Sequence, residues 1–172
     1  MSPAPVEIRE IAPEEFHLVW PIFHGVVEAG DTFALDPSTT FEEGRRMWAT
    51  PPTRAFVATR EGTVVGTYML RPVQPGLGDH VANAGYIVAP EARGQGLARL
   101  LCEDSLVRAR AAGYRAMQFS YVVASNEPAI RTWQRCGFTV VGTVPAAFRH
   151  RTLGLVDVLI MHRFLHESSR AP

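Results

Sequence analysis

The chain has 172 residues, of which 47% are hydrophobic and 20% charged, and its formal net charge at pH 7 is zero. These values exclude a disordered chain, a collagen-like repeat and a multi-domain assembly, and we expect one domain over residues 1–172. No apolar run reaches the roughly 18 residues that cross a bilayer, and Met1–Pro5 lacks the charge and apolar stretch of a signal peptide, so we expect a cytoplasmic protein without membrane contacts.

The first fifty residues predict a strand followed by two helices. Apolar and charged residues alternate over residues 6–11, as in a half-buried strand. Pro13, followed by two acids, opens a helix that we expect to run to about Glu28. A capping-box pattern at Ser38 opens the second helix, which ends before Pro51.

The middle and the end of the chain predict strands alternating with helices. Two β-rich runs, residues 54–60 and 63–70, flank Glu61-Gly62, which is typical of a tight hairpin turn. The later elements are a strand at 80–88, a helix at 94–112, a strand at 115–123, a helix at 127–136, and strands at 138–144 and 155–163. Residues 145–151 read as the loop between the last two strands. This order predicts an α/β fold with one mixed, twisted sheet and helices on both faces.

The most specific stretch runs from Val88 to Ala98. An apolar strand stops at a proline, and a turn with Gly94 and Gly96 leads into a helix. Glycines let backbone N–H groups converge, and the helix N-terminus adds positive potential, which together favour a pyrophosphate. Arg93 can add a charge-assisted contact at the rim.

Two alternatives to this interpretation are a dinucleotide-binding fold and a plain glycine-rich helix cap. The first requires a third glycine or alanine where this chain has Arg99, and a turn directly after the strand. Here five residues separate Val88 from Gly94. The second alternative fits a lone G-x-G better than it fits this longer string.

Two motifs resemble those of the GNAT N-acetyltransferases. Arg93-x-x-Gly96-x-Ala98 is similar to the family's R/Q-x-x-G-x-G/A signature. Asn126–Ile130, followed by Cys136–Phe138, resembles its N-x-x-A…G-F motif at the usual distance. The resemblance covers nearly the whole chain. It implies a GNAT-like sheet that is split between the parallel strands at 80–88 and 115–123.

The resemblance also implies that acetyl-CoA is the cosubstrate and lies in that split. Its pantetheine arm would pair with backbone near Ile87 and Val88, and an N–H near Val88 would receive the developing oxyanion. A bulge at Asn83–Gly85 is expected to force the split. Asn126 would bind the pantetheine arm, cap its helix, or do both. The implied cofactor-binding residues are Ile87, Val88, Arg93, Gly94, Gln95, Gly96, Leu97, Ala98 and Asn126.

The candidate catalytic residues are Asn83, His80 and Val88, of which the resemblance implies Val88, while Asn83 and His80 are chosen because they lie on the predicted strand beside the split. His80 has a suitable unperturbed pKa for a base, and Asn83 can orient an amine or a carboxylate. Trp133 stands where many family members have a tyrosine that protonates the leaving thiolate, and an indole is not a useful proton donor. The remaining candidates for this acid are Tyr121, Ser125, Cys136 and water.

Three further side chains carry open alternatives. Asp157 falls within an apolar strand, which predicts a paired or functional carboxylate. Arg149 and His150, in the predicted loop, could hold an acidic group of the substrate or the CoA phosphates, or could simply be solvated.

The charge is unevenly distributed along the chain, because residues 1–90 carry 6 Arg against 11 acids and residues 91–172 carry 11 Arg against 6 acids. That asymmetry fits a small polyanion or chance, and not a nucleic acid.

Several chemistries are excluded by what the chain lacks. All 17 basic residues are Arg, so a lysine Schiff base to pyridoxal phosphate and a Walker A loop are impossible. Cys102 and Cys136 form no disulfide framework, and no His, Cys or Asp cluster has metal-ligand spacing, so we expect no metal.

The expected acceptor is a small-molecule amine. Three segments, Gly66–Tyr68, Asn83–Gly85 and Pro145–Arg149, resemble a GNAT subgroup that includes enzymes acetylating proline analogues, which favours an amino acid or an analogue. The alternatives are a non-catalytic acyl-CoA-binding module and an acetyltransferase for protein N-termini or ribosomal proteins. The sequence leaves a homodimer and a monomer equally open.

Overall fold

The computed structural model of the protein describes residues 4–166. Met1–Pro3, which belong to the segment expected not to form a signal peptide, lie outside the described residues. The strands are β1 (Glu7–Ile11), β2 (Arg54–Arg60), β3 (Thr63–Pro72), β4 (Val81–Val88), β5 (Ala116–Val123), β6 (Thr139–His150) and β7 (Gly154–Phe164). The helices are α1 (Trp20–Ala29), α2 (Phe41–Ala49), α3 (Leu97–Ala111) and α4 (Glu127–Arg135), with 3-10 turns η1 (Pro13–Leu18), η2 (Gly76–Gly78) and η3 (Pro90–Ala92).

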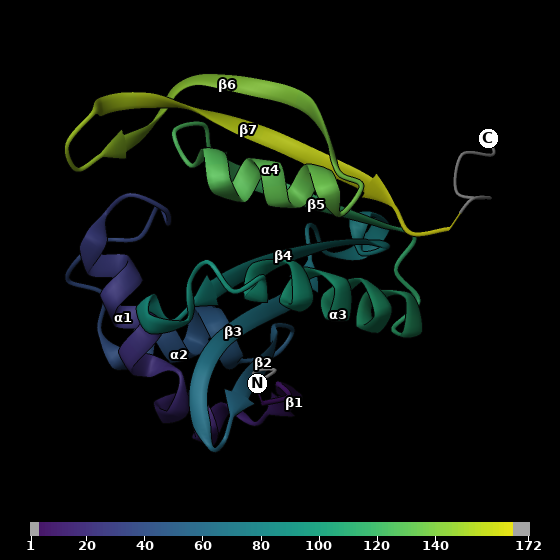
Figure 1. The fold of residues 1–172 in the computed structure, drawn as a ribbon. Helices are drawn as coiled ribbons and strands as arrows, with labels where there is room; N and C mark the ends of the chain where they lie inside the picture. Colours follow the sequence, from purple (N-terminus) through teal and green to yellow (C-terminus); the bar gives the residue numbers. More distant parts are fainter. Residues whose placement is uncertain (1–3, 167–172) are drawn as a thin grey trace.

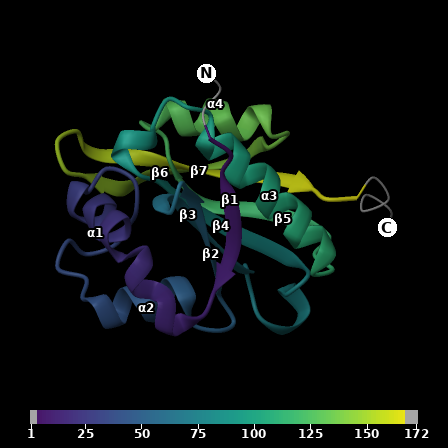
Figure 2. The same ribbon diagram turned by 60° about the horizontal axis from the view of Figure 1, so that its bottom comes forward.

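All the strands belong to one seven-stranded sheet with the order β1-β2-β3-β4-β5-β7-β6. Among the strands of residues 4–166, only β4 and β5 pair in parallel, which confirms the mixed α/β sheet (Figure 1). One core cluster packs α3 and α4 on one face of the sheet, and a second packs η1, α1 and α2 on the other (Figure 2). None of the helices within residues 4–166 is long and apolar enough to cross a membrane.

The first predicted helix is broken into two pieces. Residues 13–28 were expected to form one helix, but η1 ends at Leu18 and α1 begins at Trp20. Pro21 explains the break, because it lacks an N–H and its ring clashes with the carbonyl four residues earlier in a continuous helix. By contrast, the hairpin turn is confirmed, since Glu61 and Gly62 have φ of 49° and 77°, as a type I′ turn requires.

The split between β4 and β5 is present, but the predicted bulge in β4 is wrong. β4 and β5 pair only at Val81↔Ala116 and Ala82↔Met117. β4 keeps an unbroken antiparallel register with β3 along its whole length, so no bulge occurs at 83–85. The irregularity lies instead in β5, between Phe119 and Val122, where two residues face one residue of β7. This extra residue bends β5 toward β7 while β4 stays straight on β3.

The predicted loop at residues 145–151 is also wrong, because β6 continues to His150. Three residues, Pro145–Ala147, bulge out opposite Asp157 of β7. The backbone N–H of Ala146, whose φ is +50°, donates to Asp157 Oδ1 at 2.9 Å. Asp157 is therefore an exposed carboxylate that holds a bulge through this hydrogen bond, which agrees with the paired alternative.

Candidate active site

The backbone groups of β4 alternate between two neighbours. The N–H of Ala89 donates to Val65 O at 2.9 Å, and the N–H of Val73 donates to Val81 O at 2.8 Å. In an antiparallel ladder, bonded pairs occur at every second residue. The odd-numbered residues of β4 therefore direct their N–H and C=O groups to β3, and the even-numbered residues direct theirs toward β5.

The split thus exposes a row of backbone groups on one strand. Beyond the last β4–β5 pair, the N–H groups of Ala84, Tyr86 and Val88 face β5 without meeting a strand partner. Val88 is the predicted oxyanion donor, and its N–H points into the split. The backbone of Ile87 pairs with Thr67 of β3, and its side chain is buried in the core cluster that contains α1 and α2. The sequence predicted a backbone contact near Ile87 and Val88. The strand register shows that the N–H groups of Ala84 and Tyr86 also face the split.

Residues Arg93–Ala98, here called the glycine turn, connect the end of β4 to α3. Gly94 and Gly96 have φ of 74° and 78°, backbone angles that residues other than glycine rarely adopt. A Cβ at either position would meet nothing within 4 Å, so open space lies over this backbone. α3 begins directly after Gly96, and the N–H groups of its first turn have no partner inside the helix. The turn therefore presents several N–H groups to an anion.

The side chains of the glycine turn hold its backbone in place. Gln95 accepts a bond from Arg60 at 2.5 Å and donates to Glu91 O at 3.2 Å. Leu97 is buried in the core under α3, while Arg93 is exposed at the rim. The turn is thus anchored at its middle and at its end, with the charged group of Arg93 on the open side.

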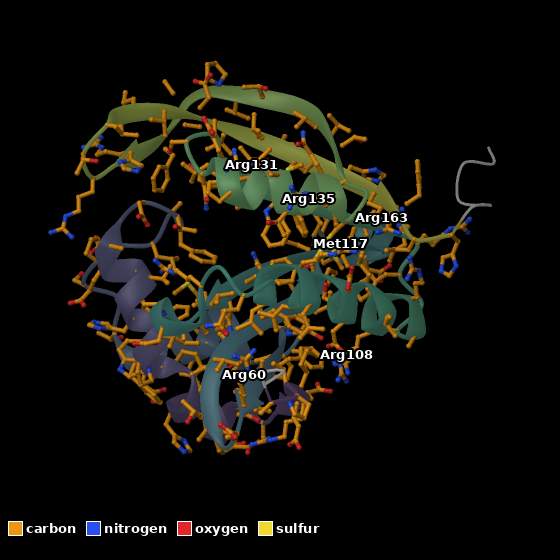
Figure 3. All side chains as sticks on the ribbon, in the orientation of Figure 1. Arg60, Arg108, Met117, Arg131, Arg135 and Arg163 are labelled. Carbon is orange, nitrogen blue, oxygen red and sulfur yellow. The ribbon has the colours of Figure 1, made fainter. Side chains whose placement is uncertain are left out.

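Basic side chains also occur around the split. Figure 3 shows Arg131 and Arg135 on α4 and Arg60 in the layer that contains β2 and β3. Arg131 pairs with Glu127 at 3.1 Å, and Arg163 of β7 donates to the backbone oxygen of Cys136. Part of the positive charge in the second half of the chain is therefore neutralised by acids or bound to carbonyls within the protein.

Trp133 lies in the core between α4 and the two diverging strands. Its ring centroid is 4.7 Å from that of Tyr86 on β4 and 5.4 Å from that of Phe119 on β5. Only 8% of Trp133 is exposed. Burial raises the pKa of Tyr86 well above its usual value, so its hydroxyl stays protonated. These rings fill the space behind the split and hold the two strands apart.

The other candidates for the acid lie in different surroundings. Tyr121, at the β5 bulge, is 45% exposed and donates its hydroxyl hydrogen to Ala147 O. Ser125 is exposed in the turn before α4, and Cys136 is buried. Tyr121 also lines a cavity.

The predicted polar site residues are not brought together. His80 is exposed just before β4, and its backbone oxygen accepts a bond from Arg115 at 2.9 Å, at the paired end of the split. Asn83 is half-buried, and as an odd-numbered residue it faces the α1 and α2 side. Asn126 caps α4 by accepting a bond from the Ala129 N–H at 3.4 Å, which confirms the capping alternative. Its contact with pantetheine stays a prediction.

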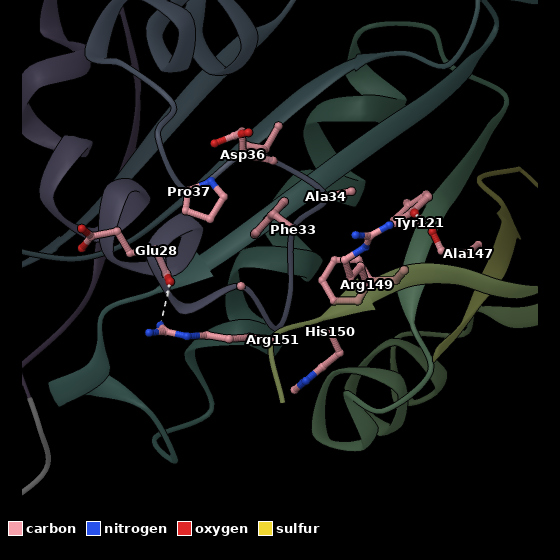
Figure 4. Close-up of a pocket in the computed structure, with 13 residues that line it drawn as sticks. Glu28, Phe33, Ala34, Asp36, Pro37, Tyr121, Ala147, Arg149, His150 and Arg151 are labelled. Carbon is pink, nitrogen blue, oxygen red and sulfur yellow. Dashed lines mark hydrogen bonds between the residues drawn. The ribbon is translucent and has the colours of Figure 1, made fainter. Parts of the chain in front are cut away.

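A cavity of about 1020 Å³ lies beside β6, and it is called here the β6 cavity (Figure 4). Its lining comes from the end of α1, the segment before α2, β5, β6 and the turn after β6. The lining residues are Glu28, Gly30, Phe33, Ala34, Leu35, Asp36, Pro37, Tyr121, Ala147, Phe148, Arg149, His150 and Arg151. The sequence pointed to Tyr121, Arg149 and His150, but no local signal marked the segment around Phe33. No group of three His, Cys, Asp or Glu in residues 4–166 is arranged to hold a metal ion.

Comparison with known proteins assigns the chain to a family. Residues 9–138 match the model of the acetyltransferase (GNAT) family, and the chain belongs to that family. A GCN5-related N-acetyltransferase from Kribbella flavida has the same fold, with a TM-score of 0.87 and 42% identity over 92% of this chain and 97% of that one.

Two curated relatives match over shorter parts of their own length. An N-acetyltransferase of Schizosaccharomyces pombe is 33% identical over 57% of this chain and 47% of its own. A mycothiol acetyltransferase of Thermomonospora curvata is 33% identical over 80% of this chain and 45% of its own. The chain therefore spans about half the length of the curated relatives that it matches.

Proposed function

We propose that the protein transfers the acetyl group of acetyl-CoA to a primary or secondary amine of a small molecule, an amino acid or an analogue. One observation carries the proposal. A strand with unpaired backbone groups ends in a turn of exposed N–H groups at the start of a helix. The strand suits an extended amide chain, and the turn suits a pyrophosphate, and CoA contains both. Family membership supports the same reaction.

In the proposed reaction the amine nitrogen attacks the thioester carbonyl directly. The new C–N bond forms, the C–S bond breaks, and the leaving thiolate takes up a proton while the amine loses one. The N–H of Val88 is proposed to stabilise the negative charge that develops on the carbonyl oxygen. The pantetheine amides are proposed to bond the backbone of Ala84 and Tyr86, and the phosphates to bond the glycine turn.

Trp133 is a buried ring of the core, and we propose water as the acid that protonates the thiolate. Asn83, on the α1 and α2 side of β4, is proposed to orient the amine. His80 lies at the end of β4 opposite the glycine turn, and its assignment as the base stays a prediction. His80→Gln tests it through the pH profile of kcat/KM, in which loss of the acidic limb is expected.

A thiol-release assay tests the proposed function. Acetyl-CoA is incubated with the protein and a panel of amino acids, polyamines and aminoglycosides, and free CoA is measured together with the mass of the acetylated amine. Stoichiometric release of thiol and of N-acetylated product from at least one small amine is the expected result. Tight binding of acetyl-CoA without release from any amine would favour a non-catalytic acyl-CoA-binding module. Release only with peptides or ribosomal proteins would favour a protein acetyltransferase.

A further inference from the structure

The β6 cavity adjoins the strand that carries the split. Phe33 lines the cavity and packs against β4, since a Cβ built on Gly85 would lie 3.4 Å from its ring. Gly85 is an odd-numbered residue of β4, so this contact lies on the same face as Asn83. A molecule in the cavity is therefore next to the strand beside which the thioester is proposed to lie.

Of the three basic side chains in the cavity, two already have partners in the protein. The backbone N–H of Arg151 donates to Gly30 O and its guanidinium to Glu28 O, both at 3.1 Å, which ties the turn to the end of α1. His150 accepts bonds at Nδ1 from two backbone N–H groups of the following turn, each at 3.2 Å. Nδ1 of His150 is therefore already occupied by the backbone of that turn.

Arg149 is the remaining cation. Its guanidinium has neither an ion pair nor a hydrogen bond to any protein group among residues 4–166, and the residue is exposed. Figure 4 shows Arg149 and Tyr121 on one wall of the cavity, with Phe33 and Asp36 on the facing wall. A guanidinium offers a planar fork of donors that matches a carboxylate.

The backbone around Arg149 is fixed although its head group is not. The bulge before it is held by the bond from Ala146 to Asp157, and Ala147 O accepts the bond from Tyr121. The preceding residue, Phe148, is 4% exposed and packs on Val123 and Val158. The rigid backbone adds no ordering cost of its own when a ligand binds, so the entropy lost is that of the Arg149 side chain alone.

The acids of the cavity do not neutralise Arg149. Asp36 accepts bonds from the hydroxyl and the N–H of Ser38, and these bonds hold its pKa below the usual value, so it stays a carboxylate. Glu28 lies 3.5 Å from His24. The cavity therefore has one uncommitted positive group and a separate negative group on the opposite wall, which complements a zwitterion.

We propose that Arg149 binds the carboxylate of the acceptor, so that the acceptors are free amino acids and their analogues rather than amines without an acid group. This inference rests on the proposed acetyl transfer and names Arg149 as the residue that determines its specificity. The apolar lining from Phe33, Leu35 and Phe148 would contact the acceptor's side chain.

The test compares amino acids with their carboxamides, which keep the amine and side chain but lack the negative charge. kcat/KM is measured for proline, leucine, lysine and glutamate and for their carboxamides, with the wild type, Arg149→Gln and Arg149→Lys. Arg45→Gln serves as the control, since it removes one arginine from an exposed pair with Glu42 outside the cavity. Each comparison with the wild type uses one substrate, so the different amine pKa values of acid and carboxamide cancel.

For at least one amino acid, Arg149→Gln is expected to lower kcat/KM by about 10- to 150-fold, the loss of one hydrogen bond to a charged group. The carboxamide should change less than about 3-fold, and Arg149→Lys should restore part of the activity toward the acid. Arg45→Gln should leave every rate within about 2-fold. The melting temperature of each variant shows whether it remains folded. If Arg149→Gln unfolds, Arg149→Lys replaces it in the test, and its kcat/KM should then fall for the amino acids and not for their carboxamides, by less than the fall expected for Arg149→Gln.

Two results would overturn the inference in distinguishable ways. Acids and carboxamides that lose activity equally, or acids that lose none, would remove Arg149 as the carboxylate site while acetyl transfer stands. Failure of the wild type to release thiol with any acid, carboxamide or amine would instead reject the acetyl transfer, and the inference with it.

Discussion

The glycine turn and the β6 cavity lie on either side of the same split sheet and differ in what carries their chemistry. In the turn the groups proposed to bind are backbone N–H groups, and the side chains mainly anchor the loop. In the cavity the backbone is anchored, and the groups proposed to bind are side chains from distant parts of the chain. A site made of backbone tolerates changes in side chains but not in φ, whereas a site made of side chains tolerates neither loss of charge nor a shift in register.

The largest effect is expected from a substitution in the glycine turn. Gly96→Val places a β-branched residue at φ 78° and turns the N–H groups away from the phosphates. Loss of two hydrogen bonds to charged groups should weaken acetyl-CoA binding by at least about 100-fold, measured by calorimetry.

Gly113→Val is the matched control for this change. Gly113 has φ 87° and open space around it, but it follows α3 at the end far from the turn. It should lower the melting temperature as Gly96→Val does and leave acetyl-CoA affinity unchanged. A folded Gly96→Val protein with affinity within about 2-fold of the wild type would remove the glycine turn from the site.

The second prediction concerns Asn83, between the two sites. Asn83→Ala should lower kcat/KM for the amine by about 10- to 150-fold, the loss of one hydrogen bond to a charged group. Acetyl-CoA affinity and melting temperature should stay the same, because β3 and β4 pair without a bulge at this position. If acetyl-CoA affinity falls in step with activity, Asn83 belongs to the CoA side of the split.

The third prediction separates packing from catalysis at Trp133. Trp133→Phe removes part of a buried ring, so the melting temperature should fall by a few degrees, for a loss of about 1–2 kcal/mol. The value of kcat should stay within about 3-fold, because water and not the indole is the proposed acid. A fall in kcat of about 100-fold at unchanged melting temperature would assign the indole a part in the reaction.

The smallest effect lies far from both sites, in the Glu10–Arg54 pair between β1 and β2. Two bonds from Arg54, at 2.8 and 2.6 Å, lower the pKa of Glu10 below its ordinary value of 4.5. The pair therefore stabilises the fold above that pH, and the contribution disappears as the pH falls through the lowered pKa. Both side chains are about two-fifths exposed, so Glu10→Gln should cost less than about 1 kcal/mol at pH 7.

Urea unfolding at pH 7 and pH 3 measures this contribution. The difference between the wild type and Glu10→Gln should be present at pH 7 and smaller at pH 3. A difference that grows toward pH 3 would contradict the assigned sign.

The backbone site could be predicted from the sequence to a far greater extent than the cavity. Gly94 and Gly96 occur between a strand pattern and a helix pattern, and this local order alone predicts the turn. The break at Pro21 was also visible in principle, because proline is tolerated in the first turn of a helix but interrupts its interior, where Pro21 falls in the predicted helix. The order of strands and helices could be predicted for the same local reasons.

The cavity depends on contacts between distant residues. The segment 145–151 contains a proline and reads as a loop, yet Asp157 on the next strand holds Ala146 at positive φ and keeps the segment in β6. The bend of β5 at residues 120–121 comes from its register with β7, whereas the sequence suggested a bulge in β4. Phe33 reaches β4 through tertiary packing alone, so no local pattern could have named it.

A crystal structure with acetyl-CoA bound tests the central claim most directly. We expect the pyrophosphate on the N–H groups of the glycine turn, the pantetheine amides on the backbone of Ala84 and Tyr86, and the thioester oxygen on the N–H of Val88. The acetyl group should face the β6 cavity. A CoA molecule whose phosphates lie away from residues 93–98, or whose pantetheine arm lies outside the space between β4 and β5, would contradict it.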